Sequence, residues 1–174
     1  MGIQFETDYN METLTAMAKG LRRTVRKKRS RRVHIFAAVV LILGLLTILA
    51  TTAGGEPLGA SGVVTLLAML VVILVSLFED KLNAWFARKR LLPGTEHAVA
   101  TFEEDGYVSA TGVTESRFSY AQIVAVAETE RYFVFALSSH HTQAYDKRTI
   151  RGGSVEDFRA FIAEKTGKPV ADIK

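Results

Sequence analysis

The sequence predicts an α+β membrane protein: a two-helix transmembrane hairpin followed by an antiparallel β-roll that a C-terminal helix caps. Three observations predict it. Two long apolar runs, at residues 33–53 and 62–78, contain no Asp, Glu, Lys or Arg. Lys and Arg flank this pair of runs on both sides. Short β-type segments follow residue 94, and an amphipathic helical pattern follows them.

The two apolar runs have the length of membrane-spanning helices. About 20 residues of helix cross a hydrocarbon core about 30 Å thick, and a helix satisfies its own backbone hydrogen bonds there. A soluble alternative would need two helices that are apolar on all faces, and a chain of 174 residues has little else to cover them. Gly and Pro between the runs predict a tight turn, so the helices are antiparallel neighbours.

These features divide the chain into six expected segments. They are a cytoplasmic strand and basic helix at 1–32, a first transmembrane helix at 33–53, an extracytoplasmic turn at 54–61, a second transmembrane helix at 62–82, a juxtamembrane linker at 83–93, and a cytoplasmic β domain with a C-terminal helix at 94–174.

Basic residues give the expected orientation. The short turn contains Glu56 and no Lys or Arg, whereas both outer flanks are basic. Because Lys and Arg stay on the cytoplasmic side, we expect a multi-pass protein of the cell membrane with both termini cytoplasmic and Glu56 outside. The same flanks supply the candidate contacts to anionic lipid headgroups, which are Arg22, Arg23, Arg26, Lys27, Lys28, Arg29, Arg31, Arg32, Arg88, Lys89 and Arg90. Nonspecific attraction to lipid phosphates and a specific lipid- or protein-binding patch both remain open, and nucleic acid is not an expected partner.

The N-terminal arm carries a strand pattern and then a helix pattern. Residues 3–7 alternate between apolar and polar side chains. Asn10 is a predicted helix N-cap, and the helix that starts at Met11 is expected to continue unbroken into the first span. Because a lone strand is unstable, we hypothesise that it pairs with the C-terminal sheet.

Six short strands are expected in the C-terminal region, at 97–104, 107–113, 117–120, 122–130, 132–137 and 142–150. Asp105-Gly106 is a hairpin turn signal, and residues 132–137 are apolar enough to be buried on both faces. Ser154 and Asp157 form a near capping box at the start of a final helix, and Gly167 has the position of a C-terminal cap.

Four stretches of this region, at 118–123, 131–137, 144–150 and 154–162, carry a resemblance to a known family. They resemble the YcxB-like family of bacterial membrane proteins, although Asp146 stands where that family has a proline before Lys147-Arg148. The resemblance extends over nearly the whole chain and implies a pleckstrin-homology-like β domain. It implies no catalytic activity. Pleckstrin-homology-like domains usually carry basic residues around their first hairpin loop, and the acidic loop at 103–105 argues against a phosphoinositide site there.

The sequence contains no set of residues typical of catalysis. There is no cysteine, no phosphate-binding loop and no serine elbow motif. His140-His141 falls at a hairpin tip and is expected to be solvated rather than to bind a metal with His97. We therefore expect no enzyme, no cofactor, no catalytic residue and no metal site.

Two functions remain. The first is a membrane-anchored, non-catalytic interaction or regulatory protein whose cytoplasmic domain binds a protein partner of unknown identity. The alternative is a small accessory or self-associating subunit of a membrane transport complex, a homo-oligomer for example, that acts through the hairpin. The spans contain no Asp, Glu, Lys or Arg, which argues against a transporter working alone.

Overall fold

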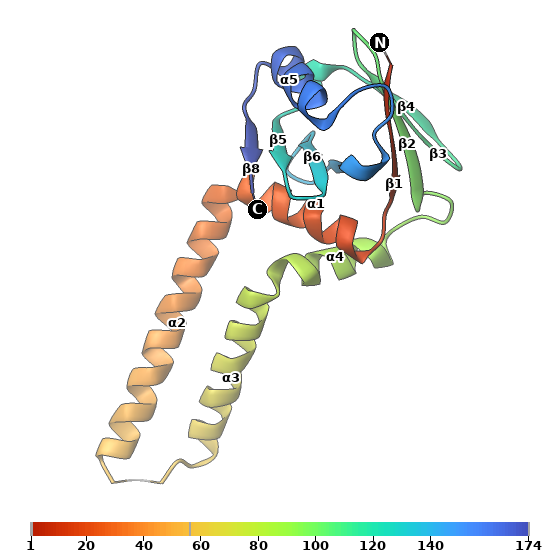
Figure 1. Cartoon of the computed structure of the whole chain (residues 1–174). Coiled ribbons are helices and arrows are strands. Elements are labelled where there is room, and N and C mark those ends of the chain that lie inside the picture. The colour runs from red at the N-terminus through yellow and green to blue at the C-terminus, as the bar shows by residue number, and fades with distance from the viewer. Residues whose placement is uncertain (1, 56, 174) are drawn as a thin grey trace.

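The computed structural model of the protein describes residues 2–55 and 57–173. Two long helices, α2 (Lys27–Ala53) and α3 (Ala60–Leu77), run side by side away from a part of the chain that is rich in strands (Figure 1). Two shorter helices, α1 (Met11–Arg23) and α4 (Glu79–Lys89), lie where the long helices meet the strands. The chain is therefore α+β, as predicted. Glu56, expected at the outer tip of the turn, lies outside the described residues.

We call α2 and α3 the apolar hairpin. Both helices are long and apolar enough, by length and composition, to cross a membrane, and the rest of the described chain buries none of their apolar stretches. The two helices approach closely at Gly44, where an added Cβ would lie only 2.8 Å from Met69 Sδ. A small residue at this position therefore allows the helices to pack.

The expectation of one continuous helix from Met11 into the first apolar run is wrong. Helix α1 ends at Arg23, and α2 begins at Lys27. The hydroxyl of Thr24 donates to the carbonyl of Gly20 at 2.7 Å, and the Thr24 backbone leaves helical geometry at φ −111° and ψ −92°. This break lets α1 lie across the strands while α2 turns away from them.

A second break divides the segment expected at 62–82. Helix α3 ends at Leu77, and α4 begins at Glu79, so most of the expected linker is helical. Glu79 and Asp80 occupy the first turn of α4, where their negative charges stabilise the positive end of the helix dipole.

The strands form two four-stranded sheets within the described residues. The first sheet has the order β1 (Ile3–Asp8), β2 (His97–Phe102), β3 (Tyr107–Thr111) and β4 (Glu115–Phe118), and all its pairs are antiparallel. The second has the order β7 (Thr142–Asp146), β6 (Tyr132–Ala136), β5 (Ala125–Glu128) and β8 (Val170–Asp172). We call these strands, with helix α5 (Val155–Thr166), the β domain.

The N-terminal strand belongs to the β domain, as hypothesised. Strand β1 pairs antiparallel with β2 over its whole length, from Ile3 opposite Phe102 to Asp8 opposite His97. One strand of this pair precedes the apolar hairpin, and the other follows it. The hairpin is therefore inserted between two neighbouring strands of one sheet.

Helix α5 begins and ends as its sequence predicts. Ser154 and Asp157 form a reciprocal capping box, and Gly167 adopts the left-handed conformation at φ 64°. The chain then adds β8, which pairs in parallel with β5 and which the sequence analysis missed. Three residues after Pro169 are too few to show a strand period.

The main core of the β domain is aromatic. Its fully buried side chains come from both sheets and from α5, and they include Phe5, Phe102, Tyr107, Phe133, Phe135 and Phe158. The rings of Phe5 and Phe158 lie 4.7 Å apart between centroids. Strand β1 therefore contributes an essential part of this core.

Strand β6 is buried on both faces, as predicted from its composition. Phe133 and Phe135 face the aromatic core, while Tyr132 and Val134 belong to a second apolar cluster that includes Met17 of α1. Helix α1 therefore covers the second sheet on the face opposite to the aromatic core.

A charged network fixes α5 and the loop after β7 to strand β5. The buried Glu128 carboxylate accepts hydrogen bonds from Arg159 at 2.6 and 2.7 Å and from Lys147 at 2.9 Å. The hydrogen bonds from Arg159 are the largest cause that lowers the pKa of Glu128 from its ordinary 4.5 to about 2.

This network predicts an acid-dependent stability. A carboxylate whose pKa is lower in the folded state stabilises the fold fully above pH 4.5, and that contribution is lost as the pH falls toward 2. We expect Glu128→Gln to lower the free energy of unfolding by about 2–3 kcal/mol at pH 7. The difference from the unsubstituted protein should vanish near pH 2, as measured by denaturant unfolding in detergent with near-ultraviolet circular dichroism of the buried tyrosines. If the two proteins differed in free energy of unfolding by the same amount from pH 7 to pH 2, the lowered pKa of Glu128 would be contradicted.

Candidate functional site

Helix α1 joins the β domain to α4 through a bidentate ion pair. The guanidinium of Arg22 donates to both carboxylate oxygens of Asp80, at 2.7 Å from Nε and 2.6 Å from Nη2. The hydrogen bonds with Asp80 are the main cause that raises the pKa of Arg22. Arg22 was a candidate lipid contact, but its side chain is only 22% exposed and is held by α4.

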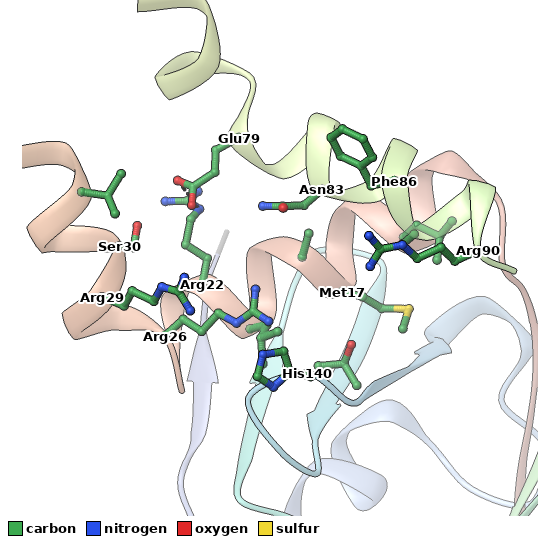
Figure 2. A pocket seen from close by; sticks show the side chains of 16 residues that line it. Met17, Arg22, Arg26, Arg29, Ser30, Glu79, Asn83, Phe86, Arg90 and His140 are labelled. Carbon is green, nitrogen blue, oxygen red and sulfur yellow. Dashed lines mark ion pairs between the residues drawn. The ribbon is translucent and has the colours of Figure 1, made fainter. Parts of the chain in front are cut away.

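A cavity of about 620 Å³ lies beside this ion pair. Its walls come from α1, the first turns of α2, the facing side of α4 and the β6–β7 turn (Figure 2). These are the elements that connect the apolar hairpin to the β domain. The cavity therefore lies at the junction between the two parts of the chain.

Basic side chains enter this cavity from three elements. Arg26 and Arg29 come from the start of α2, Arg90 from the end of α4, and His140 from the β6–β7 turn. In Figure 2 the side chains of Arg26 and Arg90 extend from opposite sides toward the space between α1 and α4. Arg26 also donates from Nε to the carbonyl of Ser139 at 2.7 Å, which fixes it against the turn that carries His140.

The cavity has an excess of positive charge. Glu79 is the acidic residue in its wall, and it lies 3.9 Å from Arg22 Nε and 3.8 Å from His34 Nε2. No carboxylate of the described residues forms an ion pair with Arg26, Arg29 or Arg90. An anion in the cavity would therefore meet three unpaired guanidinium groups.

The rest of the wall is largely apolar. It is formed by Leu14, Met17, Ala18, Leu21, Val33, Phe86 and Ala87. Val33 is also the first residue of the first apolar run, so this wall continues into the surface of the hairpin. The site can therefore hold a molecule that is anionic at one end and apolar at the other.

The other candidate lipid contacts lie outside the cavity wall. They are exposed on α1, α2 and α4, and they comprise Arg23, Lys27, Lys28, Arg31, Arg32, Arg88 and Lys89. The ammonium of Lys89 lies 3.6 Å from the centroid of the Trp85 ring, where the cation interacts with the face of the indole. Composition and spacing alone do not separate these side chains from Arg22, Arg26, Arg29 and Arg90, which line the cavity.

The histidines do not converge on a metal site within the described part of the chain. No group of three or more His, Asp or Glu side chains that could hold a metal ion occurs there. His97 contacts Asp8 at 2.7 Å across β1 and β2. His140 and His141 lie in the turn between β6 and β7, as expected, and His140 lines the cavity.

The acidic loop at 103–105 is not the first strand connection. Because β1 precedes β2 in the sheet, the first connection contains α1, the apolar hairpin and α4. The acidic loop follows β2 and is the second. Of the 22 Lys and Arg residues in the chain, 13 belong to this first connection.

Residues 102–162 match the model of the family described as YcxB-like protein. This segment of the chain is similar to the YcxB-like family. The YcxB-like segment runs from the last residue of β2 into α5 and leaves out β1, the apolar hairpin and β8. No curated protein and no solved structure matches the chain.

Proposed function

We propose that this protein is a membrane-anchored, non-catalytic interaction or regulatory protein. Its apolar hairpin spans the cell membrane twice, and its β domain lies on the cytoplasmic face, where it binds a partner protein. The observation that carries the proposal is the pairing of β1 with β2. A hairpin inserted between two neighbouring strands returns the chain to the side from which it left.

Charge supports the cytoplasmic assignment. The residues that flank the hairpin on the side of the β domain include a run from Arg26 to Arg32 in which six of seven side chains are Lys or Arg. Lys and Arg beside a span favour the cytoplasmic side. Trp85 and Phe86 of α4 are partly exposed beside this run, as is common for aromatic residues at headgroup depth.

The architecture of the β domain supports a pleckstrin-homology-like roll. Two four-stranded sheets enclose an aromatic core, and α5 caps it. We propose that this roll acts as a rigid platform, because α1 packs on its second sheet and α4 is held to α1 by Arg22 and Asp80. A partner bound to the roll would be kept at a fixed place near the membrane.

Cysteine labelling tests the membrane arrangement, because the chain contains no cysteine of its own. Gly59→Cys lies in the turn between α2 and α3, where an added Cβ meets no atom within 4 Å. Glu104→Cys lies in the β domain, where the side chain is 89% exposed. An impermeant thiol reagent applied to intact cells should label Gly59→Cys and leave Glu104→Cys unlabelled until the cells are opened. The opposite pattern, or labelling of both, would refute the arrangement.

Site-specific photo-crosslinking separates the interaction function from its alternative. The alternative is an accessory or self-associating subunit that acts through the hairpin, and the exposed apolar surfaces of α2 and α3 favour it. A photo-crosslinking residue at the exposed Val124 should capture a second protein, while one at Leu67 of α3 should capture lipid. Dimers crosslinked through Leu67, with no product from Val124, would favour the alternative.

A further inference from the structure

The cavity between α1, α2, α4 and the β6–β7 turn has a chemistry that anchoring alone does not require. A hairpin needs basic residues beside its spans, but these residues can all point into solvent or toward the bilayer surface. Here Arg26, Arg29 and Arg90 line one cavity together with His140. We propose that this cavity is a specific binding site for one anionic phospholipid of the cytoplasmic leaflet, whose phosphate lies among the three arginines.

The positive charge in the cavity has no counterpart within the described protein. Glu79 is already engaged by Arg22 and His34, and no described carboxylate pairs with Arg26, Arg29 or Arg90. Three cations near one another repel, and a phosphate that binds among them relieves that repulsion. Guanidinium groups also donate pairs of hydrogen bonds whose geometry matches phosphate oxygens.

The start of α2 adds to this attraction. Arg26 is the N-cap of α2, no side-chain hydrogen bond caps this end, and its first turn has no acidic residue. The positive end of the helix dipole therefore favours an anion near this end of α2. Arg26, Arg29 and Ser30, which belong to the N-cap and first turns of α2, line the cavity.

The apolar part of the wall selects a lipid over a soluble phosphate ester. Leu21, Val33 and Phe86 line the cavity, and Val33 begins the apolar surface of α2. Acyl chains can follow this surface into the bilayer while the phosphate stays among the arginines. A volume of about 620 Å³ is far more than one phosphate group needs and is within the range of pockets that hold drug-sized ligands.

The inference rests on the proposed function, since it places the cavity at the headgroup level of a membrane. It goes beyond that function because it distinguishes three arginines from the basic residues around them. The distinction is local: Arg31 and Arg32 belong to the same helix as Arg26 and Arg29, yet they do not line the cavity.

Binding is measured on the full chain in a neutral detergent, by native mass spectrometry and by calorimetric titration with dioctanoyl phosphatidylglycerol. Arg29→Gln combined with Arg90→Gln should weaken binding at least about tenfold, because it removes two charge-assisted contacts. Arg31→Gln combined with Arg32→Gln changes the net charge equally and should change affinity less than about twofold. Ala87→Trp fills the cavity without a charge change and should weaken binding as strongly as the arginine pair.

Two further ligands make the result decisive. Dioctanoyl phosphatidylcholine should bind far more weakly than the anionic lipid, and so should glycerol phosphate without acyl chains. Equal losses from the two arginine pairs would mean general attraction between charges and would overturn the site, as would unchanged binding by Ala87→Trp. If glycerol phosphate bound as tightly as dioctanoyl phosphatidylglycerol, the cavity would be a site for a soluble phosphate ester instead. Since this titration needs no bilayer, its failure leaves the cysteine-labelling result standing, and the two proposals fail separately.

Discussion

Replacing Phe5 with alanine is expected to lower the free energy of unfolding of the β domain by about 3–5 kcal/mol. Phe5 has no exposed surface, and its ring lies within 6.4 Å of the rings of Phe102, Phe133, Tyr145 and Phe158. The substitution would leave a cavity among side chains from both sheets and α5. The relaxed core cannot easily fill it, because these rings are held by separate elements.

The measurement is denaturant unfolding of the full chain in detergent, followed by near-ultraviolet circular dichroism of the buried tyrosines. Phe86→Ala is the matched control, because it removes the same side chain from a position on α4 that is 51% exposed. It should cost less than about 1 kcal/mol. Similar losses from the two variants would mean that β1 is not an integral strand of the domain.

Gly20→Leu is expected to destabilise the packing of α1 on the second sheet by about 2–3 kcal/mol. A Cβ at position 20 would lie 2.7 Å from Cγ1 of Val134, which is itself buried in β6. Helix propensity alone predicts the opposite sign, since leucine stabilises a helix by nearly 1 kcal/mol relative to glycine. The steric cost is larger because the sheet behind Val134 cannot move away.

A double-mutant cycle tests this contact directly. Gly20→Ala and Val134→Ala should each destabilise the protein, whereas their combination should recover at least about 1 kcal/mol of the summed loss. Gly59→Leu is the control, since the turn position has open space around it and a negative φ of −69°. Additive losses in the cycle would show that Gly20 and Val134 do not share a contact.

The sequence predicts most of the local structure because the local signals are strong. The two apolar runs, the capping box of Ser154 and Asp157 and the turn at Asp105-Gly106 each involve residues close together in the chain. Their stability comes from neighbours a few residues away. Such signals fix where elements begin and end within a few residues.

The remaining features depend on contacts between distant residues. Helix α1 packs closely on the second sheet where Gly20 meets Val134, and β8 forms where β5 offers an edge for Val170–Asp172. Arg22 and Arg29 both belong to one basic stretch in the sequence, yet Asp80 binds the first and the cavity receives the second. Composition cannot separate them, because Asp80, which binds Arg22, lies 58 residues further along the chain.

The pairing of β1 with β2 also sets an order of events during synthesis. Ile3 is made before the hairpin, but its partner Phe102 is made only after the whole hairpin. On the proposed topology, the first strand waits unpaired at the membrane surface until the second span has returned the chain to the same side. The β domain can close around Phe5 only after both spans have inserted. In a chain with one misplaced span, the first strand would stay exposed to the quality-control machinery of the cell.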